Sequence, residues 1–204
     1  SAMMEHDDLN AAVRRVLLGE NKVCGLTREQ DALAAYEAGA IYGGLIFVDT
    51  SPRAVNEEQA RKVIAAAPLS YVGVFRNADV ADVVAKADAL SLSAVQLHGD
   101  EDQAYINALR DALAPQVQIW KAQSVGTTLP ARNLHHVDKY VLDNGQGGTG
   151  QRFDWSLLKG EKLDNVLLAG GLSPDNCVEA AKTGCAGLDF NSGVESQPGI
   201  KDAS

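Results

Sequence analysis

Short apolar runs and longer amphipathic stretches follow one another along most of the chain with little interruption. The runs are rich in β-branched and aromatic residues and mostly do not alternate between polar and apolar, which is typical of strands buried on both faces of a parallel sheet. They predict eight strands, over Lys22 to Leu26, Gly43 to Phe47, Tyr71 to Phe75, Ala94 to His98, Gln118 to Ala122, Tyr140 to Asp143, Asn165 to Ala169 and Gly187 to Asn191.

The stretches between these strands carry apolar residues three to four positions apart, which is the period of a helix. They predict helices over Glu29 to Ala38, Glu57 to Ala67, Val80 to Leu90, Asp102 to Ala112 and Pro174 to Thr183. An α/β chain with eight strands, seven crossovers and no break in composition matches a (β/α)8 TIM barrel. A doubly wound open sheet is the alternative, but it usually has fewer strands and more polar edge strands. We therefore expect the barrel.

Both ends of the sequence depart from a minimal barrel. Leu9, Val13, Val16 and Leu17 form an apolar stripe with helical spacing, which predicts an extra N-terminal helix. After the eighth strand the sequence stops at Ser204, so we expect the last barrel helix to be missing. Apolar surface between the eighth and first strands would then contact water. We expect the N-terminal helix to lie in or near that groove.

Composition narrows the class of protein. The 204 residues fit one domain, and the formal charge of -9 argues against general nucleic-acid binding, which needs clustered Lys and Arg. Three cysteines without a Cys-x-x-Cys pair fit a reducing cytoplasm. No apolar run approaches the roughly 18 residues of a membrane span. The start, Ser1-Ala2-Met3-Met4, lacks the features of a signal peptide, and Ser1-Ala2 is typical of a cloning scar.

Two polar residues close predicted strands, Cys24 near the first and Asp143 at the sixth. The carboxyl ends of barrel strands share one face, and that face carries the chemistry. A strand Cys is more often a small buried hydrophobe, whereas an ionised Asp is seldom buried without a partner. Helix N-termini at this face are expected to favour a thiolate, lowering the pKa of Cys24 from about 8.5. The pair would suit a proton shuttle that needs no cofactor.

A glycine-rich loop follows Asp143, and Gly145 to Gly150 match the G-x-G-x-x-G pattern of dinucleotide-binding sites. Asp143 and Asn144 intervene after the strand, no convincing helix opens at Gly150, and the match falls in the sixth strand-loop unit. A mobile loop that closes over a substrate is therefore the favoured interpretation. The dinucleotide site remains the alternative.

Two further loops predict a phosphate site. Ala169-Gly170-Gly171-Leu172-Ser173-Pro174 follows the seventh strand, and Asn191-Ser192-Gly193-Val194-Glu195 follows the eighth. Loops at these two positions, with glycines that expose backbone N–H groups, form the phosphate site that recurs in barrel enzymes. Two ordinary turns are the alternative, but their place in adjacent units favours phosphate binding.

Three more side chains are expected at the same opening. Arg53 follows the second strand; a loop Arg is usually solvated, but one at this face could clamp a carboxylate. Gln96 and His98 alternate with Val95 and Leu97, so both could point into the barrel. A lone His is more often a core group than a catalyst, and no second ligand stands at metal-binding spacing. We therefore expect no metal.

Six motifs occur in an order that resembles the phosphoribosylanthranilate isomerase family, over residues 21 to 202. They are Lys22-Val23-Cys24-Gly25-Leu26-Thr27, Ser51-Pro52-Arg53, Val95-Gln96-Leu97-His98-Gly99, Leu142-Asp143 with Gly147-Gly148-Thr149-Gly150, Leu168-Ala169-Gly170-Gly171-Leu172, and Asp189-Phe190-Asn191-Ser192-Gly193-Val194-Glu195.

The resemblance implies a TIM-barrel isomerase of tryptophan biosynthesis that needs no cofactor. Its substrate would be N-(5-phosphoribosyl)anthranilate, and its reaction an Amadori rearrangement to 1-(2-carboxyphenylamino)-1-deoxyribulose 5-phosphate. Asp143 would be the general acid and Cys24 the general base. The resemblance also assigns substrate contacts to Arg53, Gln96, His98 and Asp189, phosphate contacts to Gly170, Gly171, Ser192 and Gly193, and a covering loop to Gly148, Thr149 and Gly150.

Residues 7 to 19 further resemble the junction in a bifunctional enterobacterial member of this family, where indole-3-glycerol-phosphate synthase precedes the isomerase. Residues 1–20 would then be a scar and a linker helix, and residues 21–204 the isomerase domain. A fused or neighbouring synthase domain is a possible partner; nucleic acid and membrane are not expected. Another phosphosugar barrel enzyme remains an alternative, but its metal-ligand or Lys–Glu catalytic set is not found at strand ends. A barrel fragment that binds phosphosugar with little or no turnover also stays open.

Overall fold

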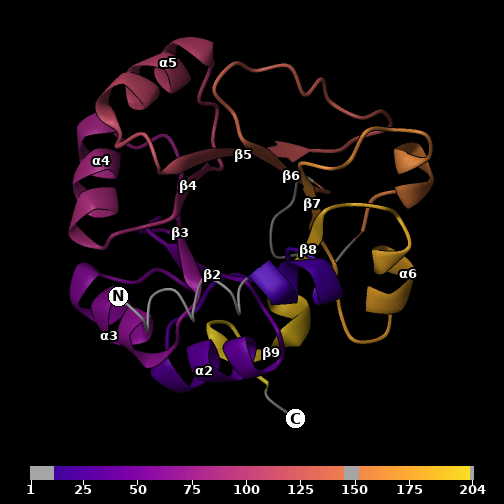
Figure 1. Cartoon of the computed structure of the whole chain (residues 1–204), viewed down its shortest axis with the longest axis horizontal. Helices are drawn as coiled ribbons and strands as arrows, with labels where there is room; N and C mark the ends of the chain where they lie inside the picture. The colour runs from indigo at the N-terminus through magenta and orange to yellow at the C-terminus, as the bar shows by residue number, and fades with distance from the viewer. Residues whose placement is uncertain (1–11, 145–151, 203–204) are drawn as a thin grey trace.

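A closed barrel of eight parallel strands forms the centre of the molecule, as the computed structural model shows for residues 12–144 and 152–202 (Figure 1). Each strand pairs with the next along the chain, and β1 pairs with β8 to close the ring. The barrel predicted from the sequence is therefore confirmed. The strands are β1 (Lys22–Val23), β2 (Tyr42–Ile46), β3 (Ser70–Phe75), β4 (Ala94–Leu97), β5 (Gln118–Ser124), β6 (Lys139–Asp143), β7 (Val166–Leu168) and β8 (Gly187–Phe190).

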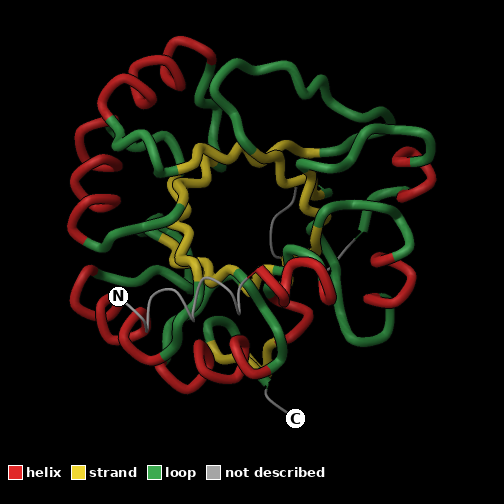
Figure 2. The backbone as a smooth tube through the Cα atoms, in the orientation of Figure 1, coloured by secondary structure: helices red, strands yellow, loops and turns green. Residues whose placement is uncertain are grey.

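Helices cover the outside of the barrel unevenly (Figure 2). Those between the first five strands are α2 (Glu29–Glu37), α3 (Glu57–Ala66), α4 (Val80–Ala89) and α5 (Gln103–Ala112). Side-chain caps fix two of their starts, because Asn56 accepts from the N–H of Gln59 and Asp102 from that of Tyr105.

The second half of the barrel has less helix. A loop joins β5 to β6, and within the described residues the β6–β7 crossover has only the 3-10 helix η1 (Trp155–Leu158). The helix predicted from Pro174 to Thr183 is shorter than expected, because α6 spans only Cys177–Ala181.

Apolar side chains fill two layers. One layer lies between the sheet and the helices, with residues such as Leu26, Leu45 and Ile106 fully buried. The other fills the barrel interior, where Tyr42 meets Trp120 edge-on with ring centroids 4.8 Å apart. Both of these aromatic residues lie near the amino ends of their strands, so that end of the barrel is a packed core.

The N-terminal helix is present, with residues 12–18 helical, and the chain directly after it contacts the turn before β8, where the Glu20 N–H donates to the Ala186 carbonyl at 2.9 Å. Val16 and Leu17 are 85% and 73% exposed, so these residues of the stripe do not fill the groove between β8 and β1. Arg14 contacts α2 from this helix: its guanidinium lies 4.0 Å from the centre of the Tyr36 ring. A stripe shows that a helix is amphipathic but not which surface it packs against.

After β8 the described chain forms a 3-10 turn, η2 (Ser192–Val194), and a hairpin of β9 (Glu195–Gln197) and β10 (Ile200–Lys201). The hairpin is tied to the start of α2, because the Lys201 N–H donates to Asp31 at 3.1 Å and the Thr27 hydroxyl donates to the Gly199 carbonyl. No α-helix follows β8 among the residues described. A groove of about 340 Å³, lined in part by Val23, Ala34 and Phe190, lies beside the hairpin.

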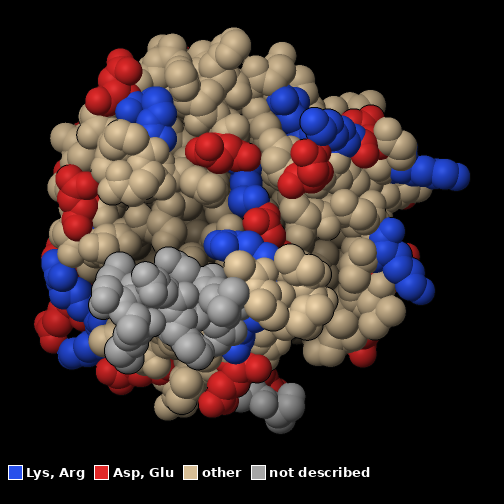
Figure 3. Space-filling view, viewed as in Figure 1, with Lys and Arg blue, Asp and Glu red and all other residues tan. Residues whose placement is uncertain are grey.

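Charges of both signs lie close together on the face shown in Figure 3, and neither forms a continuous field there. In the described part of the chain, every helix is too short or too polar to cross a bilayer.

Candidate active site

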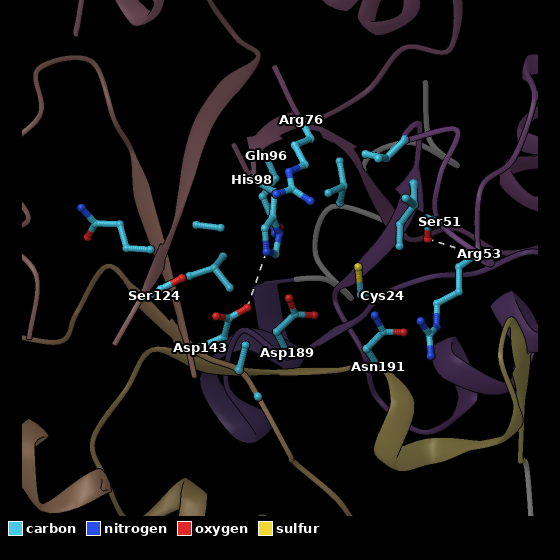
Figure 4. A pocket seen from close by; sticks show the side chains of 18 of the residues that line it. Cys24, Ser51, Arg53, Arg76, Gln96, His98, Ser124, Asp143, Asp189 and Asn191 are labelled. Atoms are coloured by element: carbon cyan, nitrogen blue, oxygen red, sulfur yellow. Dashed lines mark hydrogen bonds and ion pairs between the residues drawn. The ribbon is translucent and has the colours of Figure 1, made fainter. Parts of the chain in front are cut away.

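A cavity of about 710 Å³ opens at the carboxyl ends of the strands (Figure 4). It brings together all ten candidate residues that fall within the described chain, from six different strands or the loops that follow them. They are Cys24, Arg53, Gln96, His98, Asp143, Gly170, Gly171, Asp189, Ser192 and Gly193. The predicted covering loop of Gly148, Thr149 and Gly150 lies outside the described residues.

Cys24 follows directly after β1, and its N–H donates to the Phe190 carbonyl of β8 at 2.8 Å. Its thiol lies against Gly44 of β2, where an added Cβ would come 2.7 Å from the sulfur. Only glycine leaves room for the thiol at this point. The pKa of Cys24 is raised, mainly by burial. The expected lowering by helix N-termini is therefore wrong, because desolvation outweighs the favourable charges around the sulfur.

A buried ion pair lies next to Cys24. Lys22 of β1 and Asp189 of β8 face each other in the strand register, and Nζ of Lys22 is 2.8 Å from Oδ2 of Asp189. Burial favours a neutral Lys22, but attraction to Asp189 and to Cys24 outweighs it, so the pKa of Lys22 is raised. The positive charge of Lys22 in turn opposes the effect of burial on the pKa of Cys24. Oδ1 of Asp189 is buried and has no hydrogen-bond partner among the described residues, which leaves it for a ligand.

Asp143 ends β6, and His98 just beyond β4 lies beside it. Nε2 of His98 is 3.5 Å from Oδ2 of Asp143, and Figure 4 shows the imidazole directed at the carboxylate. The Asp143 side chain is nearly buried, whereas that of His98 is 39% exposed. Gly170 lies against the backbone of Asp143 with a φ of +84°, which favours glycine. The carboxylate is therefore buried, and the partly exposed imidazole of His98 lies between it and the solvent.

Arg53 lines the cavity but already has a carboxylate partner. Its Nε and Nη2 donate to both oxygens of Glu195, with the shortest distance 2.7 Å from Nη2. Lys201 contacts the same carboxylate at 2.8 Å. Burial alone would raise the pKa of Glu195, but hydrogen bonds from Arg53 and Lys201 outweigh it and lower the pKa. A substrate carboxylate would therefore meet Arg53 in a partly neutralised cluster.

The two predicted phosphate loops touch each other. A Cβ on Gly193 would lie 1.9 Å from the Leu172 carbonyl oxygen, so only glycine permits this approach. Gly171 has a φ of +67°, and its carbonyl accepts from the Asn176 side chain at 2.8 Å. The loops thus present backbone groups of both units to one corner of the cavity.

Several residues of the site were missed by sequence reasoning, above all Lys22, Gly44, Glu195 and Lys201. The role of Lys22 could have been predicted from its position. It stands two residues before Cys24 on a buried strand, so both side chains point to the same face. The Arg53–Glu195 contact joins positions 142 apart and leaves no local pattern. Gln96 does point inward as expected, is buried, and has Oε1 without a partner in the described part of the chain.

Comparison with known proteins agrees with this geometry. The model of the family "N-(5'phosphoribosyl)anthranilate (PRA) isomerase" matches residues 21–204. Among curated proteins, the tryptophan biosynthesis protein TrpCF of Salmonella typhi is 78% identical over 100% of this chain and 45% of its own length. The TrpCF of Yersinia pestis is 70% identical over 99% of the chain and 42% of its own length. The chain thus spans less than half of these relatives.

Solved structures are similar as well. Phosphoribosyl anthranilate isomerase from Thermus thermophilus superposes with a TM-score of 0.79 at 31% identity, covering 90% of this chain and 92% of its own. A phosphoribosyl anthranilate isomerase in complex with reduced 1-(o-carboxyphenylamino)-1-deoxyribulose 5-phosphate gives a TM-score of 0.76 at 30% identity. It covers 91% of this chain and 93% of its own.

Proposed function

The chain belongs to the N-(5′-phosphoribosyl)anthranilate isomerase family, and we propose that it is an isomerase of tryptophan biosynthesis in which Cys24 and Asp143 carry the Amadori rearrangement. The observation that supports this assignment is that a thiol and a carboxylate from separate strands line one cavity beside two glycine loops. The rearrangement moves protons within one molecule, so general acid–base groups suffice.

Asp143 is the general acid in this proposal. It protonates the ring oxygen of the ribose, the C1′–oxygen bond breaks, and the anthranilate nitrogen forms a Schiff base with C1′. Its place beside the partly exposed His98 supports the assignment, because a proton given up by the carboxyl can be replaced through the imidazole.

Cys24 is the general base. As thiolate it removes the proton from C2′, which gives an enolamine that tautomerises to the ketone. The thiolate fraction of Cys24 grows as the pH rises, and burial moves this increase to higher pH because it raises the pKa of Cys24. We therefore expect kcat/KM to increase with pH on the side of the profile that Cys24 governs.

The remaining contacts orient the substrate. The partly unpaired Asp189 carboxylate would accept from a sugar hydroxyl, and Gln96 would add a polar contact in the pocket. Backbone groups of Gly170, Gly171, Ser192 and Gly193 would hold the phosphate, as the contact between their loops suggests. For the anthranilate carboxylate, Arg53 would offer its remaining N–H groups, on Nη1 and the second of Nη2, since Nε and Nη2 each already donate to Glu195.

The assignment of acid and base is tested by generating phosphoribosylanthranilate in situ and following the loss of its fluorescence. We expect Cys24→Ser and Asp143→Asn each to lower kcat by about 10³-fold, within the range for a general acid or base. Cys177→Ser and Asp111→Asn are matched controls outside the cavity and should keep parental rates. Full activity in both site variants would refute the mechanism, whereas an inactive parent would favour a barrel that only binds phosphosugar.

Three wider assignments are also proposals. An indole-3-glycerol-phosphate synthase domain, fused or neighbouring, is the proposed partner, because the TrpCF relatives are more than twice as long as this chain. The division into residues 1–20 and 21–204 stays a prediction. Three free cysteines fit a reducing cytoplasm, the compartment we propose.

A further inference from the structure

We propose that Lys22 is a positioning residue for the isomerase reaction: its ammonium group, fixed by Asp189, holds positive charge beside Cys24 and stabilises the thiolate that takes the C2′ proton. This inference rests on the proposed role of Cys24. It assigns a function to a buried ion pair that the acid–base mechanism does not itself use.

The geometry of β1 carries the proposal. Lys22 and Cys24 are two positions apart and point to the same face, with Lys22 one layer deeper in the barrel. The Lys22 side chain is 0% exposed, so its charge is not screened by solvent. Its 2.8 Å contact with Asp189 fixes the ammonium group, and the register between β1 and β8 places the two residues directly opposite.

A buried lysine is costly unless something uses its charge. A pair of apolar residues would fill the barrel at Lys22 and Asp189 at no greater desolvation cost. Asp189 lines the cavity and Lys22 is fully buried beside it, next to a thiol whose ionisation burial disfavours and a nearby cation favours. Lys22 is the charged group that lowers the pKa of Cys24 most.

Other charges also act on Cys24. Asp189 raises its pKa, whereas Lys201 lowers it, and Arg53 interacts with the thiolate from the loop after β2. Lys201 and Arg53 share the Glu195 carboxylate, which offsets their charge. Lys22 is the cation built into the same strand as the thiol.

The test measures ionisation of Cys24 without substrate. In a Cys177→Ser/Cys185→Ser background, Cys24 is the one remaining thiol of the sequence, and its alkylation by iodoacetamide is followed against pH. The thiolate sulfur displaces iodide, so the rate reports the thiolate fraction. We expect Lys22→Met to move the midpoint of this profile upward by about one pH unit or more, which lowers the thiolate fraction below the midpoint about tenfold per unit.

Lys139→Met is the matched control. Lys139 is also a buried barrel lysine with a carboxylate partner, Glu20, but it begins β6 at the opposite end of the barrel. It should leave the Cys24 midpoint in place. If Lys22 has only a structural role, Lys22→Met will lower the melting temperature but leave the midpoint of Cys24 alkylation unchanged.

If Lys22→Met does not fold, Lys22→Met/Asp189→Asn removes both charges and tests the same claim. Its midpoint should still rise, though less, because the opposing effect of Asp189 is lost too. An unchanged midpoint in either folded variant would overturn the role of Lys22. Loss of isomerase activity in Cys24→Ser bears on the general base alone, so the two claims can fail separately.

Discussion

Cys24 and Asp143 reach the same cavity from contrasting surroundings. Cys24 is enclosed by packed backbone and fixed charges, with Gly44 against its sulfur and the Lys22–Asp189 pair beneath it. Asp143 is as little exposed as Cys24, but its neighbour His98 is 39% exposed and connects the carboxylate to the solvent-facing part of the cavity. Figure 4 shows the two groups on different sides of one opening.

The contrast indicates that the two proton transfers are controlled in different ways. A base in a closed, low-dielectric site depends on exact packing and on permanent charges, because water cannot adjust to its ionisation. An acid beside a partly exposed polar group depends more on exchange of its proton with that neighbour. Changes of packing should therefore affect the Cys24 side strongly, and changes of polar partners should affect the Asp143 side moderately.

Among substitutions that keep both the acid and the base, Gly44→Ala should have the largest effect on activity. The new methyl group would lie 2.7 Å from the Cys24 sulfur and 2.9 Å from its Cα, so β1 or the thiol must move. We expect kcat to fall about 100-fold, as for other small displacements of a catalytic group. The free energy of unfolding should fall by about 1–3 kcal/mol because the core is overfilled. Stopped assays and denaturant titration give both numbers.

Gly126→Ala is the matched control for this substitution. No atom lies within 4 Å of a Cβ built at Gly126, on the loop after β5. Activity should stay at the parental level, and stability should change little or rise slightly. If Gly44→Ala behaves like Gly126→Ala, the thiol does not depend on close packing and the contrast fails.

His98→Asn should have an intermediate effect. It removes the imidazole 3.5 Å from Asp143 but leaves the carboxylate and its access to water. We expect kcat to fall about tenfold, at the lower end of what proton-transfer partners contribute. The alkylation profile of Cys24 identifies the limb of the pH–rate profile that Cys24 governs. His98→Asn should change the other limb. A loss as large as that of Asp143→Asn would show that Asp143 cannot exchange its proton without His98.

Glu195→Gln should have the smallest effect on the rate of the reaction. Its clearest effect should be on how the free energy of unfolding changes at acid pH. The lowered pKa of Glu195 contributes stability that is present above about pH 4.5 and is lost as the pH falls through its folded pKa. The free energy of unfolding of the parent should therefore drop more steeply than that of Glu195→Gln below about pH 4.5. At neutral pH the variant should be less stable by about 1–3 kcal/mol, since Arg53 and Lys201 lose a charged partner. Parallel slopes in the two proteins would show that the cluster contributes nothing to acid sensitivity.

Local sequence patterns predicted the parts of the molecule that local physics determines. Unalternating apolar runs placed all eight strands, and the strand-end positions of Cys24 and Asp143 brought them to one cavity. The pattern could not show which surface the N-terminal stripe would cover, because amphipathicity does not identify a partner. In the structure, Val16 and Leu17 of this stripe are exposed.

The electrostatics of the site depends on burial and on long-range contacts, which the sequence does not show. The expected lowering of the Cys24 pKa considered helix ends but not burial, which dominates. The sequence indicated that Arg53 could bind a carboxylate of a ligand. Its partner Glu195 is distant in sequence and contacts it only in the folded chain. Lys22 lies inside a predicted strand, and its spacing of two from Cys24 indicates that both side chains point to the same face.

The division of labour between acid and base is tested most directly by trapping the Schiff base. Each variant is mixed with phosphoribosylanthranilate and cyanoborohydride, which reduces the open-chain imine, and the reduced product is measured. Cys24→Ser should still open the ring and accumulate reduced imine, whereas Asp143→Asn should form little of it. Equal trapping in both variants, or trapping only in Asp143→Asn, would contradict the assignment of Asp143 as acid and Cys24 as base.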